Sequence, residues 1–135
     1  MAKWKVTLTK RQLILINNAL EFYFRFMMGQ EMYVANEFCL DALGGYGVDE
    51  FCARREKAEQ ALRVCFRSVF PKGYCEKKSD TSVDMADMWS AIRHALWEAR
   101  PEPKSHDTVD AYRPYHEGDL PPIKVERMGR KNESV

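Results

Sequence analysis

The sequence predicts an α+β fold: about four helices with a small antiparallel sheet that pairs the N-terminal and C-terminal strands. Residues 4–9 alternate apolar and polar side chains, a pattern typical of a short strand, with Trp4, Val6 and Leu8 on one side. Four later segments repeat apolar residues at helical spacing. Near the C-terminus, residues 123–125 (Ile-Lys-Val) are a candidate second strand, and we expect them to pair with the first.

Length and composition indicate one globular domain. The chain has 135 residues, of which 45% are hydrophobic, and a formal net charge of +1. We expect a single ligand-binding domain over residues 1–127 and a disordered tail over 128–135, where the sequence is polar. The near-neutral charge argues against DNA as a partner. Because no apolar run could span a bilayer and the start does not resemble a signal peptide, we expect a cytoplasmic protein with no membrane partner.

The first helix is expected over residues 10–28. Thr9 and Gln12 form a capping-box pattern at its start, and Gly29 is placed to end it. Its apolar residues fall into two stripes, one of Leu13, Ile16, Leu20, Phe24 and Met27, the other of Leu15, Ala19, Phe22 and Phe26. A surface helix usually needs one stripe. The helix is therefore either central in the fold or shared with another subunit, which favours a homo-oligomer.

Three further helices are expected, over residues 31–43, 50–70 and about 81–98. Asp49 is the expected cap of the helix over residues 50–70. Thr81, Ser82 and Asp84 offer caps for the helix over residues 81–98. The glycine-rich residues 44–47 follow a helix and lack the ending of a phosphate-binding loop, so a turn is favoured over a ligand loop. The polar residues 71–84 are either a solvated loop or a basic rim for an anionic ligand.

The cysteines and histidines do not predict a metal site. No Cys-x-x-Cys pair is present, and all three histidines lie far from the cysteines in the sequence. A disulfide framework is not expected in a protein without an export signal. Cys52 and Cys65 fall on the apolar stripe of the third helix and are expected in the core.

The sequence lacks the parts of a recognisable enzyme. It has no Gly-x-Ser-x-Gly elbow, no Walker loop and no His-Glu-x-x-His helix, and His94 is expected to be a structural residue. We therefore expect no catalytic residue and no cofactor. Binding a small, multiply charged ligand needs only arginines for phosphates and an aromatic ring for a base, and residues 70–74 and 112–115 contain such side chains.

Several short stretches resemble the phage Thoeris anti-defence proteins of the first type. The matching stretches are Leu8-Thr-Lys-Arg-Gln-Leu, Ala19-Leu-Glu-Phe-Tyr-Phe-Arg25, Met28-Gly-Gln30, Phe70-Pro71, Ile92-Arg-His-Ala-Leu-Trp97 and Leu120-Pro-Pro-Ile-Lys-Val-Glu126. The resemblance implies a sponge that binds cyclic ADP-ribose isomers, such as glycocyclic ADP-ribose, without degrading them. It also implies binding of cyclic di- or trinucleotides at a second site, assembly as a homodimer or hexamer, and block of Thoeris and CBASS effectors in the host bacterial cytoplasm.

The resemblance also implies roles for individual residues. Arg93 would contact the diphosphate of the ligand, and Arg113 would be a second phosphate clamp. Phe70, or Phe66 one turn earlier, would stack on adenine. The second site would combine Arg25 with Met28, Gly29 and Gln30 near a subunit interface. The loop over residues 72–82 departs from the Gly/Asn-rich loop of the family, which puts ligand contacts from that loop in doubt.

Two alternatives stay open at this point. Arg93 could instead form an ion pair on the helix surface with Asp87 or Glu98. The protein as a whole could be a small phage regulator that acts through protein–protein contact, with the apolar first helix as its docking surface.

Overall fold

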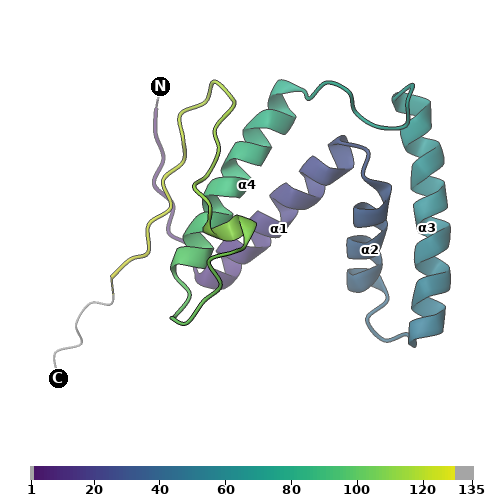
Figure 1. The fold of residues 1–135 in the computed structure, drawn as a ribbon, viewed down its shortest axis with the longest axis horizontal. Coiled ribbons are helices and arrows are strands. Elements are labelled where there is room, and N and C mark those ends of the chain that lie inside the picture. The colour runs from purple at the N-terminus through teal and green to yellow at the C-terminus, as the bar shows by residue number, and fades with distance from the viewer. Residues whose placement is uncertain (1, 130–135) are drawn as a thin grey trace.

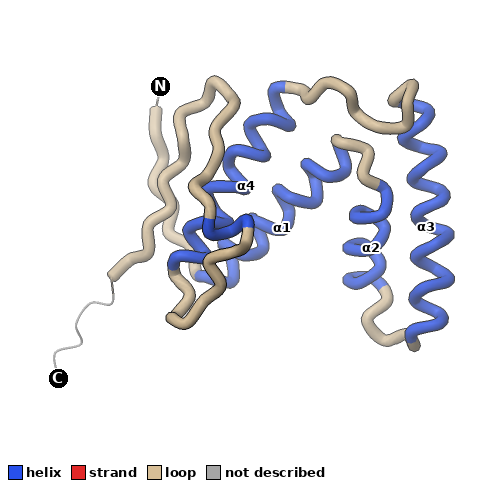
Figure 2. The backbone as a smooth tube through the Cα atoms, in the orientation of Figure 1, coloured by secondary structure: helices blue, strands red, loops and turns tan. Residues whose placement is uncertain are grey.

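The computed structural model describes residues 2–129, and their regular structure is entirely helical (Figures 1 and 2). Its elements are α1 (Lys10–Met27), α2 (Glu31–Ala42), α3 (Val48–Val69), α4 (Asp80–Glu98) and a short 3-10 helix, η1 (Val109–Ala111). No helix among these residues is long and apolar enough to cross a membrane. The expected tail lies, from residue 130 onward, outside the described residues.

The predicted α+β fold is wrong, because no strand forms within residues 2–129. Residues 4–9 and 123–125 are non-helical, but they do not form the expected sheet. An isolated pair of short strands is marginal in water unless a third strand or a packed layer supports it. Pro121 and Pro122 also remove two backbone donors directly before the second segment. The fold is therefore all-α.

The four helices pack as two pairs. Helix α1 packs against α4, and α2 runs antiparallel to α3, as Figure 1 shows. A short turn joins α1 to α2, and the loop over residues 70–79 joins α3 to α4. The two pairs therefore meet where α1 ends and α2 begins.

The turn between α1 and α2 depends on Gly29. Its φ of +73° lies in the left-handed region, which strongly favours glycine. A Cβ atom at this position would also lie 3.3 Å from the backbone of Gly73 and of Tyr74. The amide N–H of Cys75 donates to the carbonyl oxygen of Met28 at 3.3 Å, which holds the two loops together. The predicted helix end at Gly29 is confirmed.

The helix starts were predicted in part. The capping box of α1 is present, with the Thr9 hydroxyl accepting from the amide of Gln12. Asp49 is not a cap, because α3 begins at Val48 and Asp49 lies in its first turn, where its charge still favours the helix dipole. The cap of α4 is Ser79, whose hydroxyl accepts from the amide of Ser82 at 3.1 Å.

The apolar core is small and draws residues from all four helices. It consists of Phe24, Val34, Ala35, Cys39, Phe66, Ala86, Trp89, Ile92 and Trp97. Phe24 and Trp89 stack with their ring centres 6.3 Å apart, which joins α1 to α4. Cys52 and Cys65 are exposed, so their expected place in the core is wrong. Helix α3 packs mainly against α2, and its Phe66 also touches Phe26 of α1.

The two stripes of α1 have different surroundings. Phe24 of the first stripe is buried against α4. In the second stripe Leu15 is 50% exposed and Phe26 is 38% exposed. The first helix is thus a core helix on one side only, and its second apolar side faces outward.

The long segment after α4 is held by polar side chains of that helix. We call residues 105–123 the strap. Asp87 is only 7% exposed, and its carboxylate accepts from the backbone amides of Glu117 (3.0 Å) and Gly118 (2.8 Å). The imidazole of His116 lies 3.3 Å from the same carboxylate. A single buried charge therefore anchors one end of the strap.

Three more side chains of α4 hold the strap toward η1. The Ser90 hydroxyl donates to the carbonyl of Tyr115 at 3.2 Å, and the Trp97 indole donates to the carbonyl of Ser105 at 2.8 Å. His94 bonds through Nδ1 to the carbonyl of Asp110 at 2.9 Å. A carbonyl oxygen only accepts, so Nδ1 carries the proton. His94 therefore has the structural contact expected from its place on the helix.

Substitution of Asp87 tests this anchor. We expect Asp87→Ala to lower the free energy of unfolding by about 2 kcal/mol, because it leaves two part-buried backbone amides without their charged acceptor. Urea unfolding followed by circular dichroism measures the change. Asp119→Ala removes an exposed strap carboxylate and should stay within about 0.5 kcal/mol of the parent protein. Equal stability of the two variants would contradict the anchoring role.

Candidate functional site

Two arginines lie against one buried tryptophan at the junction of α1 and α4. The guanidinium carbon of Arg93 is 4.1 Å from the centre of the Trp89 ring, and that of Arg25 is 5.5 Å from it. Arg25 also lies 5.3 Å from the ring centre of Tyr33 on α2. Tyr115 of the strap lies near both arginines, whose positive charges act to lower its pKa. We call Arg25, Tyr33, Trp89, Arg93 and Tyr115 the Trp89 cluster.

The local sequence explains how the helices place these side chains. Arg93 follows Trp89 by one helical turn on α4, so the two side chains share a face. Arg25 lies in the last turn of α1, next to Phe24, which stacks on Trp89 from the same helix. The crossing of α1 and α4 therefore brings both guanidinium groups to one ring.

Each guanidinium has a carboxylate beside it. Nε of Arg93 is 3.1 Å from Asp110, so its partner is a strap residue and neither Asp87 nor Glu98. Nη2 of Arg25 is 3.5 Å from Glu21, and Nη1 donates to the side chain of Gln30 at 2.9 Å. The two positive charges are thus balanced, and an anionic ligand would compete with Asp110 and Glu21.

Two N–H groups of the cluster have no acceptor among the described residues. They are the indole N–H of Trp89 and the Nε–H of Arg25, both buried. A buried donor without an acceptor costs roughly 1–3 kcal/mol. The cluster therefore has unused hydrogen-bond donors as well as positive charge.

Burial and neighbouring charges shift the two tyrosines of the cluster. The pKa of Tyr33 is raised well above its usual range by burial and by the carboxylates of Glu21 and Glu37. The pKa of Tyr115 is raised by burial, while the positive charge of Arg93 opposes this shift. Both phenols are therefore neutral at ordinary pH and can donate a hydrogen bond.

The structure divides the residues that the sequence pointed to. Arg25 and Gln30 are in direct contact, and Arg93 joins Arg25 at Trp89. Met28 and Gly29 lie instead in the α1–α2 turn, where a Cβ on Gly29 would lie 3.4 Å from the Phe70 ring. Residues expected in two separate sites, Arg93 and Arg25, therefore meet at Trp89. Met28 and Gly29, expected beside Arg25, lie in the turn near Phe70 instead.

The aromatic residues near the turn differ in access. Phe66 is only 3% exposed and packs edge-on against Phe26 at 5.3 Å between ring centres, so its ring has no free face for adenine. Phe70 is half-buried, with its ring centre 6.5 Å from that of Phe66. Of the two residues expected to stack on a base, only Phe70 has partly accessible surface.

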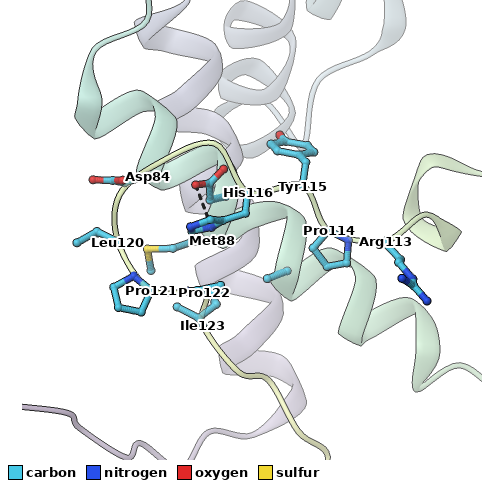
Figure 3. A pocket seen from close by; sticks show the side chains of 12 residues that line it. Asp84, Met88, Arg113, Pro114, Tyr115, His116, Leu120, Pro121, Pro122 and Ile123 are labelled. Atoms are coloured by element: carbon cyan, nitrogen blue, oxygen red, sulfur yellow. Dashed lines mark ion pairs between the residues drawn. The ribbon is translucent and has the colours of Figure 1, made fainter.

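Arg113 lies away from Arg93, on the wall of a cavity between α4 and the strap. This strap cavity has a volume of about 340 Å³, and its lining is mainly apolar. Met88, Leu120, Pro122 and Ile123 contribute to its walls, and Asp84 lies at its edge (Figure 3). The side chain of Arg113 points away from Leu120 and Pro121 in the same view.

The sequence does not single out Tyr33 or Trp89 as members of the site, and it points to Tyr115 only within the aromatic and basic stretch of residues 112–115. Trp89 lies on the buried side of its helix, which by itself indicates a core residue. Its spacing of four residues from Arg93 was the available signal, because a tryptophan and an arginine at that spacing are neighbours on a helix. Tyr33 reaches the cluster from another helix, so no local pattern marks it.

Within residues 2–129, no group of three or more His, Cys, Asp or Glu side chains is arranged to hold a metal ion. No protein-family model matches this chain, and no curated protein or solved structure matches it either. The family resemblance drawn from the sequence therefore stays a prediction.

An alkaline titration tests the environment of Tyr33. Because its native pKa is raised, the neutral phenol stabilises the fold fully below about pH 10, the usual tyrosine pKa, and this stabilisation is lost as the pH rises toward the native pKa. We expect Tyr33→Phe to remove phenolate absorbance only from the most alkaline part of the native titration. In urea the same difference should move to about pH 10. Loss of absorbance near pH 10 in the folded protein would contradict the assignment.

Proposed function

We propose that this protein binds and sequesters a cyclic nucleotide immune signal without degrading it. The observation that carries the proposal is the pair of guanidinium groups within 5.5 Å of one tryptophan ring. Arginines suit phosphates through their planar, multiple donors, and aromatic rings suit a nucleobase. The Trp89 cluster combines both features in one place.

The chemistry of capture follows from the free donors of the cluster. The nearest approach of Arg93 to Asp110 is through Nε, and its two terminal nitrogens make no hydrogen bond to the described residues. A diphosphate could therefore engage those nitrogens and draw Arg25 from the weaker contact with Glu21. Tyr115, which is 40% exposed, offers a ring and a neutral hydroxyl to the rest of the ligand.

The ligand class is taken from the sequence resemblance. We infer glycocyclic ADP-ribose isomers as the main ligand, with cyclic di- or trinucleotides as a second class, and the host bacterial cytoplasm as the place of action. Sequestration would keep the signal from Thoeris effectors and, for cyclic oligonucleotides, from CBASS effectors. Arg113 and Phe70 are the remaining candidates for contacts outside the Trp89 cluster.

Calorimetry with a cyclic ADP-ribose isomer tests the proposal. The complex is then heated, and the released ligand is identified by chromatography. A sponge binds tightly and releases the same molecule, whereas an enzyme returns a different one. No binding of any isomer or cyclic oligonucleotide would refute the proposal.

Substitution of Arg93 tests the site itself. We expect Arg93→Ala to weaken binding by about 1.5 kcal/mol or more, as for the loss of a charge-assisted hydrogen bond. Arg54→Ala is the matched control, because it removes an exposed arginine on α3 that pairs with Glu50. Calorimetry measures both variants after circular dichroism confirms that they are folded. Unchanged affinity in a folded Arg93→Ala variant would remove Arg93 from the site.

A homo-oligomer is part of the same proposal. The exposed residues of the second stripe of α1 support it: Leu15 is 50% exposed, and Phe26, which touches Phe66 at one edge, is 38% exposed. A standard interface covers roughly 800 Å² on each partner, so neighbouring exposed side chains would contribute as well.

Analytical ultracentrifugation tests this interface. We expect Leu15→Lys to raise the dissociation constant of the oligomer at least tenfold, because it places a charge in an apolar contact. Gln60→Lys adds the same charge at an exposed position of α3 and should leave assembly unchanged. Equal effects of the two variants would move the interface away from this stripe.

The exposed stripe also favours a second candidate function, a regulator that acts through contact with another protein. In that case the unmodified protein would bind no cyclic nucleotide. Leu15→Lys would abolish its binding to the partner protein. Calorimetry therefore separates the two functions.

A further inference from the structure

Residues 2–8 form a non-helical arm before α1. Over residues 2–8 every position is exposed. Trp4 is 91% exposed and Val6 is 70% exposed. Lysines alternate with them at positions 3 and 5, so the two apolar side chains share one side of the segment. Tryptophan side chains are highly buried on average. A ring as exposed as that of Trp4 therefore indicates an interaction surface.

The strap cavity has the matching chemistry. Its walls include Met88, Pro122 and Ile123, and Leu120 at its rim is 47% exposed. A volume of about 340 Å³ is at the lower end of the range for ligand sites, roughly 300–1,000 Å³, and suits one large side chain. The cavity is open to a ring that enters from outside.

Charge also matches the arm to this cavity. Lys3 and Lys5 flank Trp4, and the carboxylate of Asp84 lies at the edge of the cavity, with Asp119 close by in the strap. The strap cavity combines Arg113 with the carboxylates of Asp84 and Asp87, whereas the groove between α2 and α3 is lined by Arg54 and Lys57 with no carboxylate and fits the arm less well. Like charges disfavour the arm there.

We propose that the N-terminal arm of one copy docks in the strap cavity of a second copy, with Trp4 inserted and the two lysines beside Asp84. The capping box at Thr9 fixes the point where the arm leaves α1. Seven extended residues span about 23 Å, enough to cross to a neighbouring molecule. In a two-fold dimer the exchange is reciprocal, so two arms fill two cavities.

Photo-crosslinking of the full-length chain tests the docking. Benzoylphenylalanine replaces Trp4, and tagged and untagged copies are mixed so that links between copies can be identified by mass. We expect links between copies whose peptides contain residues 84–91 or 113–123 of the other copy. Links confined to one copy, links to α2 and α3 only, or no links at all would each overturn the proposal.

A charge exchange provides an independent test in solution. We expect Asp84→Lys to raise the dimer dissociation constant at least fivefold in ultracentrifugation, and Asp41→Lys, an exposed site on α2, to leave it unchanged. Lys3→Glu with Lys5→Glu should restore dimers of the Asp84→Lys protein. No rescue in a folded triple variant, or a wild-type chain that stays monomeric, would overturn the proposal. The Arg93→Ala variant should dimerise normally, because Arg93 does not line the strap cavity.

Discussion

The buried carboxylate of Asp87 is the constraint on which the second half of the structure depends. The strap has few apolar side chains to bury, and most of its residues are exposed. Hydrophobic burial alone could not offset the entropy of ordering so long a segment. Two backbone amides, from Glu117 and Gly118, and the imidazole of His116 converge on this one charge. A charge this deeply buried must in turn be satisfied by donors, so the helix and the strap hold each other in place.

Part of the geometry of the candidate site depends on this anchor. The helices by themselves bring Arg25, Trp89 and Arg93 together. The strap supplies Asp110, which holds Arg93, and Tyr115, whose carbonyl is fixed by Ser90. A displacement of the strap would therefore free Arg93 from its carboxylate and change the access to Trp89. In this way the stability of the strap and the charge balance of the site are linked through one face of α4.

The parts of the fold set by local chemistry could be predicted from the sequence, and the parts set by distant contacts could not. The Thr9–Gln12 box and Gly29 fixed the ends of α1 because capping and a positive φ are local requirements. The expected sheet depended on pairing between the two ends of the chain, which periodicity cannot test. Asp87 lies thirty residues from the amides that it holds. On a helix such an acidic residue is ordinarily solvent-exposed or a cap, so no sequence pattern marked it as an anchor.

The charge balance of the Trp89 cluster bears directly on the proposed binding role. Both guanidinium groups are held by carboxylates in the free protein, so the site is ordered before any ligand arrives. An anion that displaces Glu21 and Asp110 gains the arginines but releases two carboxylates close by, and this exchange disfavours singly charged anions. A ligand with two linked phosphates replaces both carboxylates at once and loses less entropy than two separate anions. For the proposed cyclic nucleotide ligand, whose phosphates are linked, this arrangement would favour capture over that of singly charged anions.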